Sequence, residues 1–365
     1  MAKLGEVCLL KAGKFVSAND ISPEYNKGLY PCFGGNGIRG YVADYTHDGE
    51  FPLIGRQGAL CGNVNLASGK FHATEHAVVV QPKIEMNVHW LYYALNAMNL
   101  GQYATGAAQP GLAVSKLETL SIEIPNISEQ NKIAQTLYKV EQLVNFRKQQ
   151  LAKLDELVKA RFVEMFGDEQ AFNKEPLSQN VEEMFIGPFG SSLKNENFVS
   201  KENGYCMVYE QKHAIRKTMD VETRYIDKPK YEELKRFSIH GGDIIVSCRG
   251  TIGETYIVPL NAPLGIMHPS IMKIRVKDSI YNRVFFDFLL QEKLKQHEAQ
   301  ANGSGVKMAV TASALGKEEF IVPSIPFQNQ FAAFVERVDQ QKQTVQQSLE
   351  KLELMKKALM QEYFG

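Results

Sequence analysis

The feature that most constrains this chain is an internal repeat. The segment IPNISEQNKIAQ at 124–135 returns as VPSIPFQNQFAA at 322–333, a shift of 198 residues. The shift holds without a gap from Leu117/Leu315 to Gly167/Gly365, and 17 of the 51 aligned pairs are identical. Average residue usage would give roughly one identity in sixteen. The chain is therefore a tandem duplication, and its fold must contain the same long element twice.

Each copy carries apolar residues at alternating spacings of four and three, which is typical of a coiled-coil seam on a long helix. The predicted seam residues are Val140, Val144, Leu151, Leu154, Val158, Val338, Val345, Leu349, Leu352 and Leu359. Polar residues interrupt the seam at Arg147 and Arg161 in one copy and at Lys342 and Lys356 in the other. About 38 residues give a rod of roughly 57 Å. The shared phase favours pairing of the two helices with each other over two unrelated amphipathic helices.

The regions before the helices have mixed composition and are more distantly related to each other. GRQGALCG at 55–62 parallels SCRGTIGE at 247–254, and EHAVVVQP at 75–82 parallels MHPSIMKI at 267–274, which aligns His76 with His268. We predict an α+β fold of two mixed α/β domains in tandem. Two long helices separate and follow them, and their shared heptad phase predicts that they pair with each other as a coiled coil. The predicted segments are 1–125, 126–168, 169–323 and 324–365.

Composition narrows the function classes. Lysine plus arginine and aspartate plus glutamate number 41 each, so DNA binding would have to use local patches. The five cysteines are far apart and odd in number, which favours buried thiols in a reducing compartment. The apolar runs are short, and the N-terminus has neither the continuous apolar run nor the cleavage site of a signal peptide. We expect a cytoplasmic protein without membrane contact.

The segment YPCFGGNGIRGY at 30–41 invites a reading as a nucleotide-binding loop. Such a loop should open a helix, because helix amides supply the anion site. The residues after Gly37 instead alternate weakly and meet a polar turn at 44–50, which favours strand, turn, strand.

Sequence motifs for catalysis are missing. The chain contains no Pro-Pro dipeptide, so it lacks the motif that holds an amino group for methyl transfer, and it has no Gly-Lys-Ser/Thr loop and no Gly-x-Ser-x-Gly elbow. Asp227 with Glu233–Lys235 is a weak nuclease-like match. His72 and His76 could share one face of a strand, where polar contacts from a loop are favoured over a metal. We predict a chain without catalytic residues or metal ligands.

The repeated helix start, the ending MFGD, the glycine segment and the RGTIG turn resemble the specificity subunits of type I restriction-modification systems. The resemblance covers the whole chain. One departure is that Pro326 and Phe327 stand in the second copy where Ser128 and Glu129 stand in the first.

The resemblance implies two target-recognition domains that each read half of a bipartite site in double-stranded DNA. It implies that the two helices form an antiparallel coiled coil with pseudo-two-fold symmetry, which sets the half-site separation and docks two adenine methyltransferase subunits, with restriction and translocase subunits completing the complex. S-adenosylmethionine, ATP and magnesium would then belong to the partner subunits, which flip out the target base. A rod of roughly 57 Å corresponds to about 17 base pairs.

Direct readout needs donors, acceptors and cations on loops that can enter a groove. In the first domain the candidate DNA-binding residues are Asn36, Arg39, Arg56, Gln57, His76 and Gln109. In the second domain they are Ser192, Lys194, Arg249, Thr251, His268, Ser304 and Lys307. An ordinary turn or surface role remains open for each of them.

Two rival functions also stay open. One is a coiled-coil adaptor whose heads bind proteins, which would lack salt-dependent DNA affinity. The other is a DNA methyltransferase that uses the glycine segment for its cofactor, against which the missing amino-group motif argues.

Overall fold

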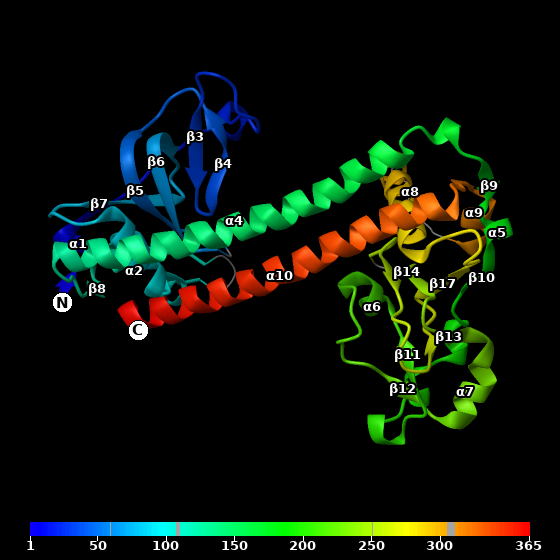
Figure 1. Cartoon of the computed structure of the whole chain (residues 1–365). Coiled ribbons are helices and arrows are strands. Elements are labelled where there is room, and N and C mark those ends of the chain that lie inside the picture. The colour runs from blue at the N-terminus through cyan, green and yellow to red at the C-terminus, as the bar shows by residue number, and fades with distance from the viewer. Residues whose placement is uncertain (59, 107–109, 250, 305–310) are drawn as a thin grey trace. The chain divides into compact units, whose positions relative to one another are not determined.

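The computed structural model describes residues 1–58, 60–106, 110–249, 251–304 and 311–365. Its contacts divide the chain into two compact units (Figure 1). Unit 1 comprises Met1–Leu151 with Thr344–Gly365, and unit 2 comprises Ala152–Gln343. Two helices of 40 residues, α4 (Ile127–Phe166) and α10 (Ile325–Phe364), each contribute one part to either unit. The contacts thus group each strand-rich head with helix segments, whereas the sequence analysis treats heads and helices as separate segments.

Unit 1 contains one main antiparallel sheet with a parallel pair at β3 and β6, in the strand order β2-β7-β5-β6-β3-β4. Besides its parts of α4 and α10, its elements are β1 (Ala2–Lys3), α1 (Leu4–Val7), β2 (Cys8–Ala12), η1 (Ala18–Asp20), β3 (Tyr30–Gly34), β4 (Gly37–Val42), β5 (His47–Gly55), β6 (Val64–Ala73), β7 (Ala77–Pro82), α2 (Val88–Ala97), η2 (Leu100–Tyr103), α3 (Val114–Glu118) and β8 (Ser121–Ile122).

Unit 2 has two four-stranded sheets, ordered β10-β17-β14-β15 and β12-β11-β16-β13. Its elements are η3 (Glu169–Ala171), β9 (Lys174–Pro176), α5 (Leu177–Asn180), β10 (Val181–Ile186), η4 (Gly190–Ser192), η5 (Asn195–Asn197), η6 (Lys201–Asn203), β11 (Cys206–Tyr209), α6 (Gln211–Arg216), β12 (Tyr225–Ile226), α7 (Lys228–Leu234), η7 (Lys235–Phe237), β13 (Ser238–Ile239), β14 (Ile244–Ser247), β15 (Thr255–Ile257), β16 (Gly265–Met267), β17 (Ile271–Val276), α8 (Arg283–Ser304), α9 (Ala312–Lys317) and β18 (Glu319–Ile321).

The two heads share a frame that the strand registers define. Ala12 pairs with Val78 in unit 1 as Ile186 pairs with Met272 in unit 2, so β2 and β7 correspond to β10 and β17. The long strand β6 corresponds to β15 and β16 together, because β5 pairs with its first part and β3 runs parallel to its last part. Residues 258–264 separate β15 from β16 and include Pro259 and Pro263. Proline cannot donate to a strand ladder, so the single sheet of unit 1 is split in unit 2.

The repeated Gln-Asn pair at each helix start has the same role in both units. In unit 1 the Gln130 side chain accepts from the Asn87 amide at 2.9 Å and donates to the Pro125 carbonyl at 2.8 Å, while Asn87 donates to the Asn131 side chain at 2.7 Å. Asn87 in turn caps α2 by accepting from the Trp90 amide. The pair therefore fastens the long helix to the preceding helix.

In unit 2 Gln328 makes the equivalent bonds to Asn282 at 2.9 Å and to the Pro323 carbonyl at 2.7 Å, and it also donates to the Ile280 carbonyl at 2.8 Å. Asn282 likewise donates to Asn329. Phe327, the replacement for Glu129, packs its ring 5.1 Å from Phe166, so the departure from the first copy adds core contact.

The long helices contact each other in both units, with residue numbers rising along one helix and falling along the other. In unit 1 Glu141 pairs with Lys356 at 2.7 Å and Lys148 with Glu353 at 3.0 Å. In unit 2 Asp155 pairs with Lys342 at 2.6 Å, and Phe162 lies 5.5 Å from Phe331. The helices are therefore antiparallel within each unit, and the lysines that interrupt the apolar ladder pair with acids of the facing helix.

The predicted seam residues lie on the inner side of these helices. Seven of the ten are buried, namely Val140, Val144, Leu154, Val158, Val338, Val345 and Leu349. Leu151, Leu352 and Leu359 are half-buried, and Leu359 packs against the core of unit 1.

Candidate functional site

The glycine segment forms the hairpin β3–β4, and the strand, turn, strand predicted after Gly37 is confirmed as β4, a turn at 43–46 and β5, although β5 begins at His47, inside the predicted turn. Its tip, at Gly35 and Asn36, lies against other backbone segments. A Cβ built on Gly55 would stand 2.0 Å from the Gly35 carbonyl oxygen, so this approach requires glycine at position 55. A helix start that could bind phosphate does not follow the turn, which removes the structural basis of the nucleotide-loop reading.

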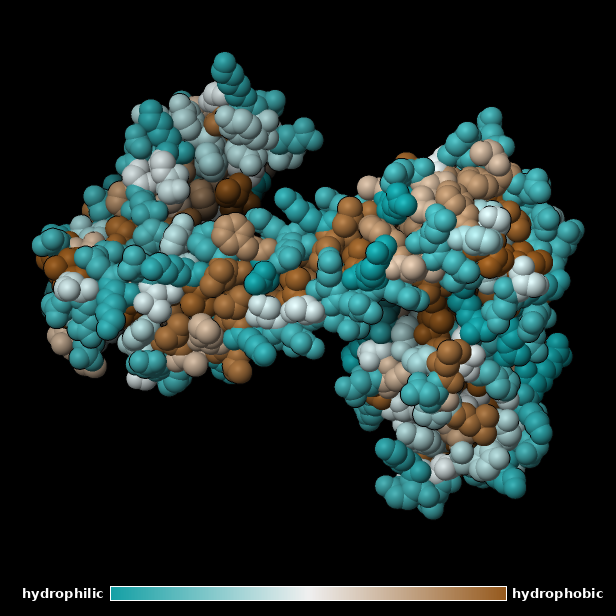
Figure 2. All heavy atoms as spheres, viewed as in Figure 1, coloured by the Kyte–Doolittle hydropathy of each residue, from teal (hydrophilic) through white to brown (hydrophobic). Residues whose placement is uncertain are grey.

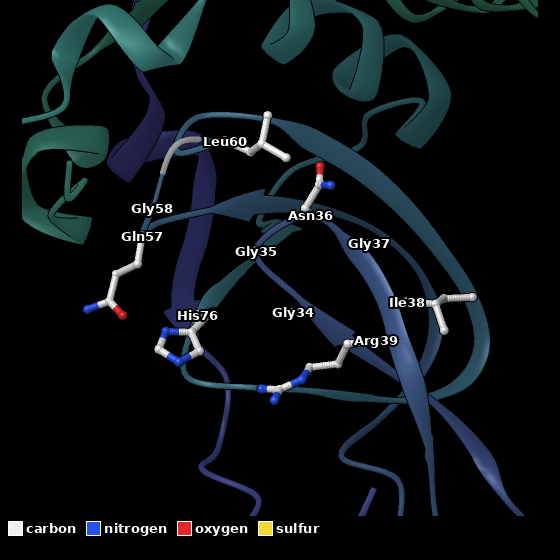
Figure 3. Close-up of a pocket in the computed structure, with 10 residues that line it drawn as sticks. All are labelled: Gly34, Gly35, Asn36, Gly37, Ile38, Arg39, Gln57, Gly58, Leu60 and His76. Atoms are coloured by element: carbon white, nitrogen blue, oxygen red, sulfur yellow. The ribbon is translucent and has the colours of Figure 1, made fainter. Parts of the chain in front are cut away.

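Next to the hairpin tip lies a hollow of about 590 Å³, which we call the hairpin hollow (Figure 3). It is lined by Gly34, Gly35, Asn36, Gly37, Ile38, Arg39, Gln57, Gly58, Leu60 and His76. Four predicted site residues, Asn36, Arg39, Gln57 and His76, thus meet from three separate segments of the chain. Most of the other lining residues are glycines, which have no side chains to shield the four polar side chains, so the backbone of a ligand can approach them.

A β-bulge directs Arg39 into this hollow. The register of β3 and β4 shifts between Cys32, opposite Gly40, and Phe33, opposite Ile38, which leaves Arg39 as the extra residue. Bulges commonly redirect side chains beside functional sites. Figure 3 shows the Arg39 side chain extending toward His76, and a Cβ on Gly34 would meet its Cδ at 3.3 Å.

Among the residues that the structure describes, buried polar atoms without a hydrogen-bond partner lie beside the hairpin hollow. They include Nε of Arg56 and Nδ1 of His76. The Arg56 amide donates to the His76 carbonyl at 3.0 Å, so the two residues are adjacent. Asn36, by contrast, accepts from the Asn63 side chain at 2.8 Å. Unpaired buried polar atoms are costly, which favours a ligand that pairs with them. Gln109 lies outside the described residues.

In unit 2 a short helix stands where unit 1 has the hairpin tip. Phe33 and Tyr209 correspond, because the amides of Thr74 and His268 donate to their carbonyls at 2.9 Å in the two units. After Tyr209 the chain enters α6, and Glu210 pairs with Lys212 at 2.9 Å and with Arg224. Arg224 also lies over the Phe198 ring at 4.0 Å. The two units therefore present different chemistry from one frame.

The ring of His268, a predicted site residue, interacts with this cluster. Burial lowers the pKa of its ring, Glu210 opposes that shift, and the cations Arg224, Arg249 and Lys212 lower the pKa further. Its Nδ1 lies 2.7 Å from the Ser270 hydroxyl. A neutral imidazole at physiological pH can accept or donate a hydrogen bond but cannot serve as a phosphate-binding cation.

Of the other predicted residues of unit 2, Arg249 acts on the His268 ring, and the rest are dispersed. Ser192 ends η4, and Lys194 precedes η5 and lies 3.8 Å from Glu196. Arg249 and Thr251 are exposed. Ser304 is the last residue of α8, and Lys307 lies outside the described residues.

The structure corrects one alignment from the sequence. The strand registers give a shift of 194 between β7 and β17, which pairs Thr74 with His268 and His76 with Ser270. His76 and His268 are therefore not equivalent. In the shared frame the two histidines lie two positions apart. The sequence match was false because the residues that flank them barely resemble each other.

Sequence reasoning missed Lys212, Arg224 and Glu210 as a cluster. The sequence signal was the run of lysines and arginines between 194 and 236, among which acidic residues are interspersed. Lys212, Arg224 and Lys230 form ion pairs with those acidic residues.

The weaker enzymatic candidates have structural roles. Asp227 caps α7 by accepting from the Lys230 amide at 2.9 Å, and Glu233 pairs with Lys230. The two His72 ring nitrogens lie near the carbonyls of Asp44 and Lys14, at 3.3 and 3.2 Å. Within the described ranges, no group of three or more His, Cys, Asp or Glu residues is placed to hold a metal ion.

The prediction of buried thiols is confirmed for four of the five cysteines, and Cys248 is half-buried. All five cysteines are free; Cys8, Cys32, Cys61 and Cys206 are buried, and burial raises the pKa of the Cys8 and Cys206 thiols to about 11. Among the helices that the structure describes, none has the length and apolar character needed to cross a membrane.

Comparison with known proteins points to one family. A family model described as the type I restriction modification DNA specificity domain matches residues 1–156 and 191–354. The Escherichia coli type I restriction enzyme EcoprrI specificity subunit is 53% identical over 143 residues, which are 39% of this chain and 36% of that protein. The Haemophilus influenzae putative type I restriction enzyme specificity subunit S.HindORF215P is 30% identical over 240 residues, 63% of this chain and 60% of that protein. The match thus spans less than two thirds of either relative.

Solved structures share the fold. The S subunit of a type I restriction-modification system from M. genitalium superposes with a TM-score of 0.65 at 18% identity, covering 100% of this chain and 95% of that one. A chain from a type I system studied for complex assembly and conformational transition gives a TM-score of 0.60 at 14% identity, with 100% and 96% covered.

Proposed function

The chain belongs to the family of type I restriction-modification specificity proteins, and on that premise we propose that it is the DNA sequence-recognition subunit of a type I complex. Each head reads one half of a bipartite site in double-stranded DNA. The chain supplies recognition, and the catalytic groups belong to partner subunits.

The observation that carries this proposal is one frame with two different candidate reading surfaces. The strand registers and the Gln-Asn pairs are equivalent in the two units. The surfaces differ: a glycine-lined hollow with Arg39, Gln57 and His76 in unit 1, and a helix with the Glu210 cluster in unit 2. A protein that reads two different half-sites needs this combination, because the scaffold must repeat while the base contacts must not.

The long helices would form the antiparallel coiled coil that sets the spacing between half-sites. Forty residues correspond to roughly 60 Å of helix, or about 18 base pairs at 3.4 Å per step. The antiparallel ion pairs described above support this role.

The same helices would dock two adenine methyltransferase subunits, with restriction and translocase subunits joining them. Exposed apolar side chains support docking: Leu143 and Phe146 on α4, and Leu354 and Met355 on α10. Figure 2 shows hydrophobic side chains along the helices of unit 1. Contiguous exposed apolar surface commonly marks a protein interface. S-adenosylmethionine, ATP and magnesium would be bound by the partners.

The test is methylome sequencing of cells that co-express this chain with a cognate methyltransferase subunit, compared with cells that express either protein alone. The proposal expects a bipartite motif with methyladenine in both halves, found only with co-expression. If both proteins are soluble and associated but methylation is unchanged, the adaptor function replaces it.

A further inference from the structure

Two exposed phenylalanines occupy the same place in the shared frame. Phe15 follows β2 and is 75% exposed, and Phe189 follows β10 and is 87% exposed. Each lies two residues after a glycine, Gly13 or Gly187, whose amide donates at 3.0 Å to the first residue of the equivalent strand, Ala77 or Ile271. The equivalence comes from backbone hydrogen bonds and not from sequence alignment.

The two glycines lock the loops to the frame. A Cβ on Gly13 would stand 2.6 Å from the Thr74 carbonyl oxygen, and a Cβ on Gly187 would stand 2.3 Å from that of His268, the residue equivalent to Thr74. Beyond Phe189 the chain is held again, because the Ser192 amide donates to the Phe189 carbonyl at 2.8 Å and Leu193 is buried. The rings therefore project from anchored loops.

The rings contribute little to folding. A single exposed apolar side chain is ordinary on a protein surface. Here an exposed phenyl recurs at one position of two heads whose loops, 13–19 and 187–193, share only glycine, phenylalanine and serine over seven positions. An anchored, water-exposed ring that recurs in this way indicates a contact made in the bound state.

The surroundings of both loops favour nucleic acid as the partner. In unit 1 the Lys14 amide donates to the Ala73 carbonyl, and the amide of the next residue, Thr74, donates to the Phe33 carbonyl. Phe33 directly precedes Gly34, which lines the hairpin hollow. In unit 2 Gly187 abuts His268, whose ring lies in the field of Arg224, Arg249 and Lys212. Each ring thus belongs to the segment beside the candidate reading surface of its own unit.

We propose that Phe15 and Phe189 are paired aromatic wedges, each of which inserts at a base step of its half-site and stacks on an exposed base. Apolar wedges of this kind unstack a base step and bend the duplex. The proposal rests on the proposed function, since it requires that the heads bind DNA.

The test uses the complex of this chain with its methyltransferase subunits and duplexes that carry the motif found by methylome sequencing. 2-Aminopurine, whose fluorescence rises on unstacking, replaces one adenine at a time, excluding the methylated adenine. We expect one step of enhanced fluorescence in each half-site. Phe15→Ala should abolish the signal in one half and Phe189→Ala in the other, and each should weaken binding roughly 5- to 150-fold.

Leu260→Ala is the matched control, because Leu260 is 78% exposed in unit 2 but lies outside these loops; it should leave binding and fluorescence unchanged. Phe189→Leu should retain part of the binding because leucine can still act as a wedge.

If the wild-type complex does not bind the duplex, the proposed function fails. If it binds and the alanine variants bind and fluoresce like wild type, the wedge is wrong. Two further results would overturn it. One is that the alanine variants no longer co-purify with the methyltransferase subunits. The other is that the loss of binding appears only where thymine is replaced by uracil, which would assign the contact to the thymine methyl group.

Discussion

Unit 1 and unit 2 share one duplicated frame of strands. They differ in the continuity of one strand and in the segment that follows the strand beside it. In unit 1 the strand β6 is continuous, and the hairpin tip at Gly35 closes against Gly55. In unit 2 the equivalent strand is split by a stretch with Pro259 and Pro263, and α6 replaces the hairpin. The difference teaches that a local insertion can change the presented surface while the hydrogen-bonded framework around it persists.

The largest expected difference between the units is at the ends of the long helices. Phe166 is buried among five aromatic rings, including Phe285 at 4.7 Å. Its repeat partner Phe364 is half-buried and lies 6.4 Å from Trp90. Phe166→Ala should lower the free energy of unfolding by about 3–5 kcal/mol, and Phe364→Ala by about 1–2 kcal/mol. Urea denaturation measures both, and equal losses would contradict this comparison.

The second expected effect comes from placing the unit 2 residue in unit 1. Ser247 is the counterpart of Gly55, and its hydroxyl accepts from the Glu254 amide at 2.9 Å. Gly55→Ser should push the Gly35 turn away, cost about 1–3 kcal/mol and remove methylation of one half-site. Ser247→Gly, the reverse change in unit 2, should leave methylation of that same half-site unchanged. Methylome sequencing and thermal unfolding check both variants; retention of both half-sites by Gly55→Ser would disprove a role for the tip.

The third test concerns the Gln-Asn pairs that make the units alike. Gln130→Ala and Gln328→Ala should each cost about 1–3 kcal/mol, because the change leaves buried backbone groups unpaired. Gln328 should cost more, since it also bonds to the Ile280 carbonyl. The exposed repeat pair Gln149 and Gln347 provides matched alanine controls, which should be neutral. Denaturation curves that show the controls equally harmful would remove the special role of the pair.

The smallest expected effect is a pH dependence. Burial lowers the pKa of His213, Glu210 opposes this shift, and Lys212 adds to it; the Glu210 amide donates to its Nδ1 at 3.0 Å, and the Tyr209 ring lies beside it. The unfolded chain takes up a proton near pH 6.5 and the folded chain only at lower pH. This contribution to stability is therefore complete above about pH 6.5 and is lost as the pH falls toward the folded pKa.

The melting temperature should fall modestly between pH 7.5 and 5.5, and His213→Gln should flatten the curve. His268 has a pKa lowered in the same direction, as has His47 in unit 1. A curve as steep in His213→Gln as in the unchanged chain would assign the effect to the other two histidines.

Much of the framework was readable from the sequence. The helices were predictable because period and repeat are local: the predicted helical segments enclose α4 and α10, which begin at Ile127 and Ile325. The match of the turn at 55–62 to 247–254 was correct at its start, where Gly55 corresponds to Ser247. It was one position off at its end, because Gly62 corresponds to Gly253: both take positive φ and bond back to Gly55 and Ser247. The match of His76 to His268 was wrong, because strand register depends on partners distant in the chain.

The sequence by itself determined the duplication, the two long helices as candidates for pairing, the strand, turn, strand after Gly37 and the family resemblance. These rest on spacing and identity, which a single chain displays directly. Only the tertiary structure decided that Asn36, Arg39, Gln57 and His76 share one hollow, that Gln130 and Gln328 hold the preceding helix, and that Phe15 and Phe189 are equivalent. Those relations are set by hydrogen bonds between segments far apart in sequence, and no local pattern encodes them.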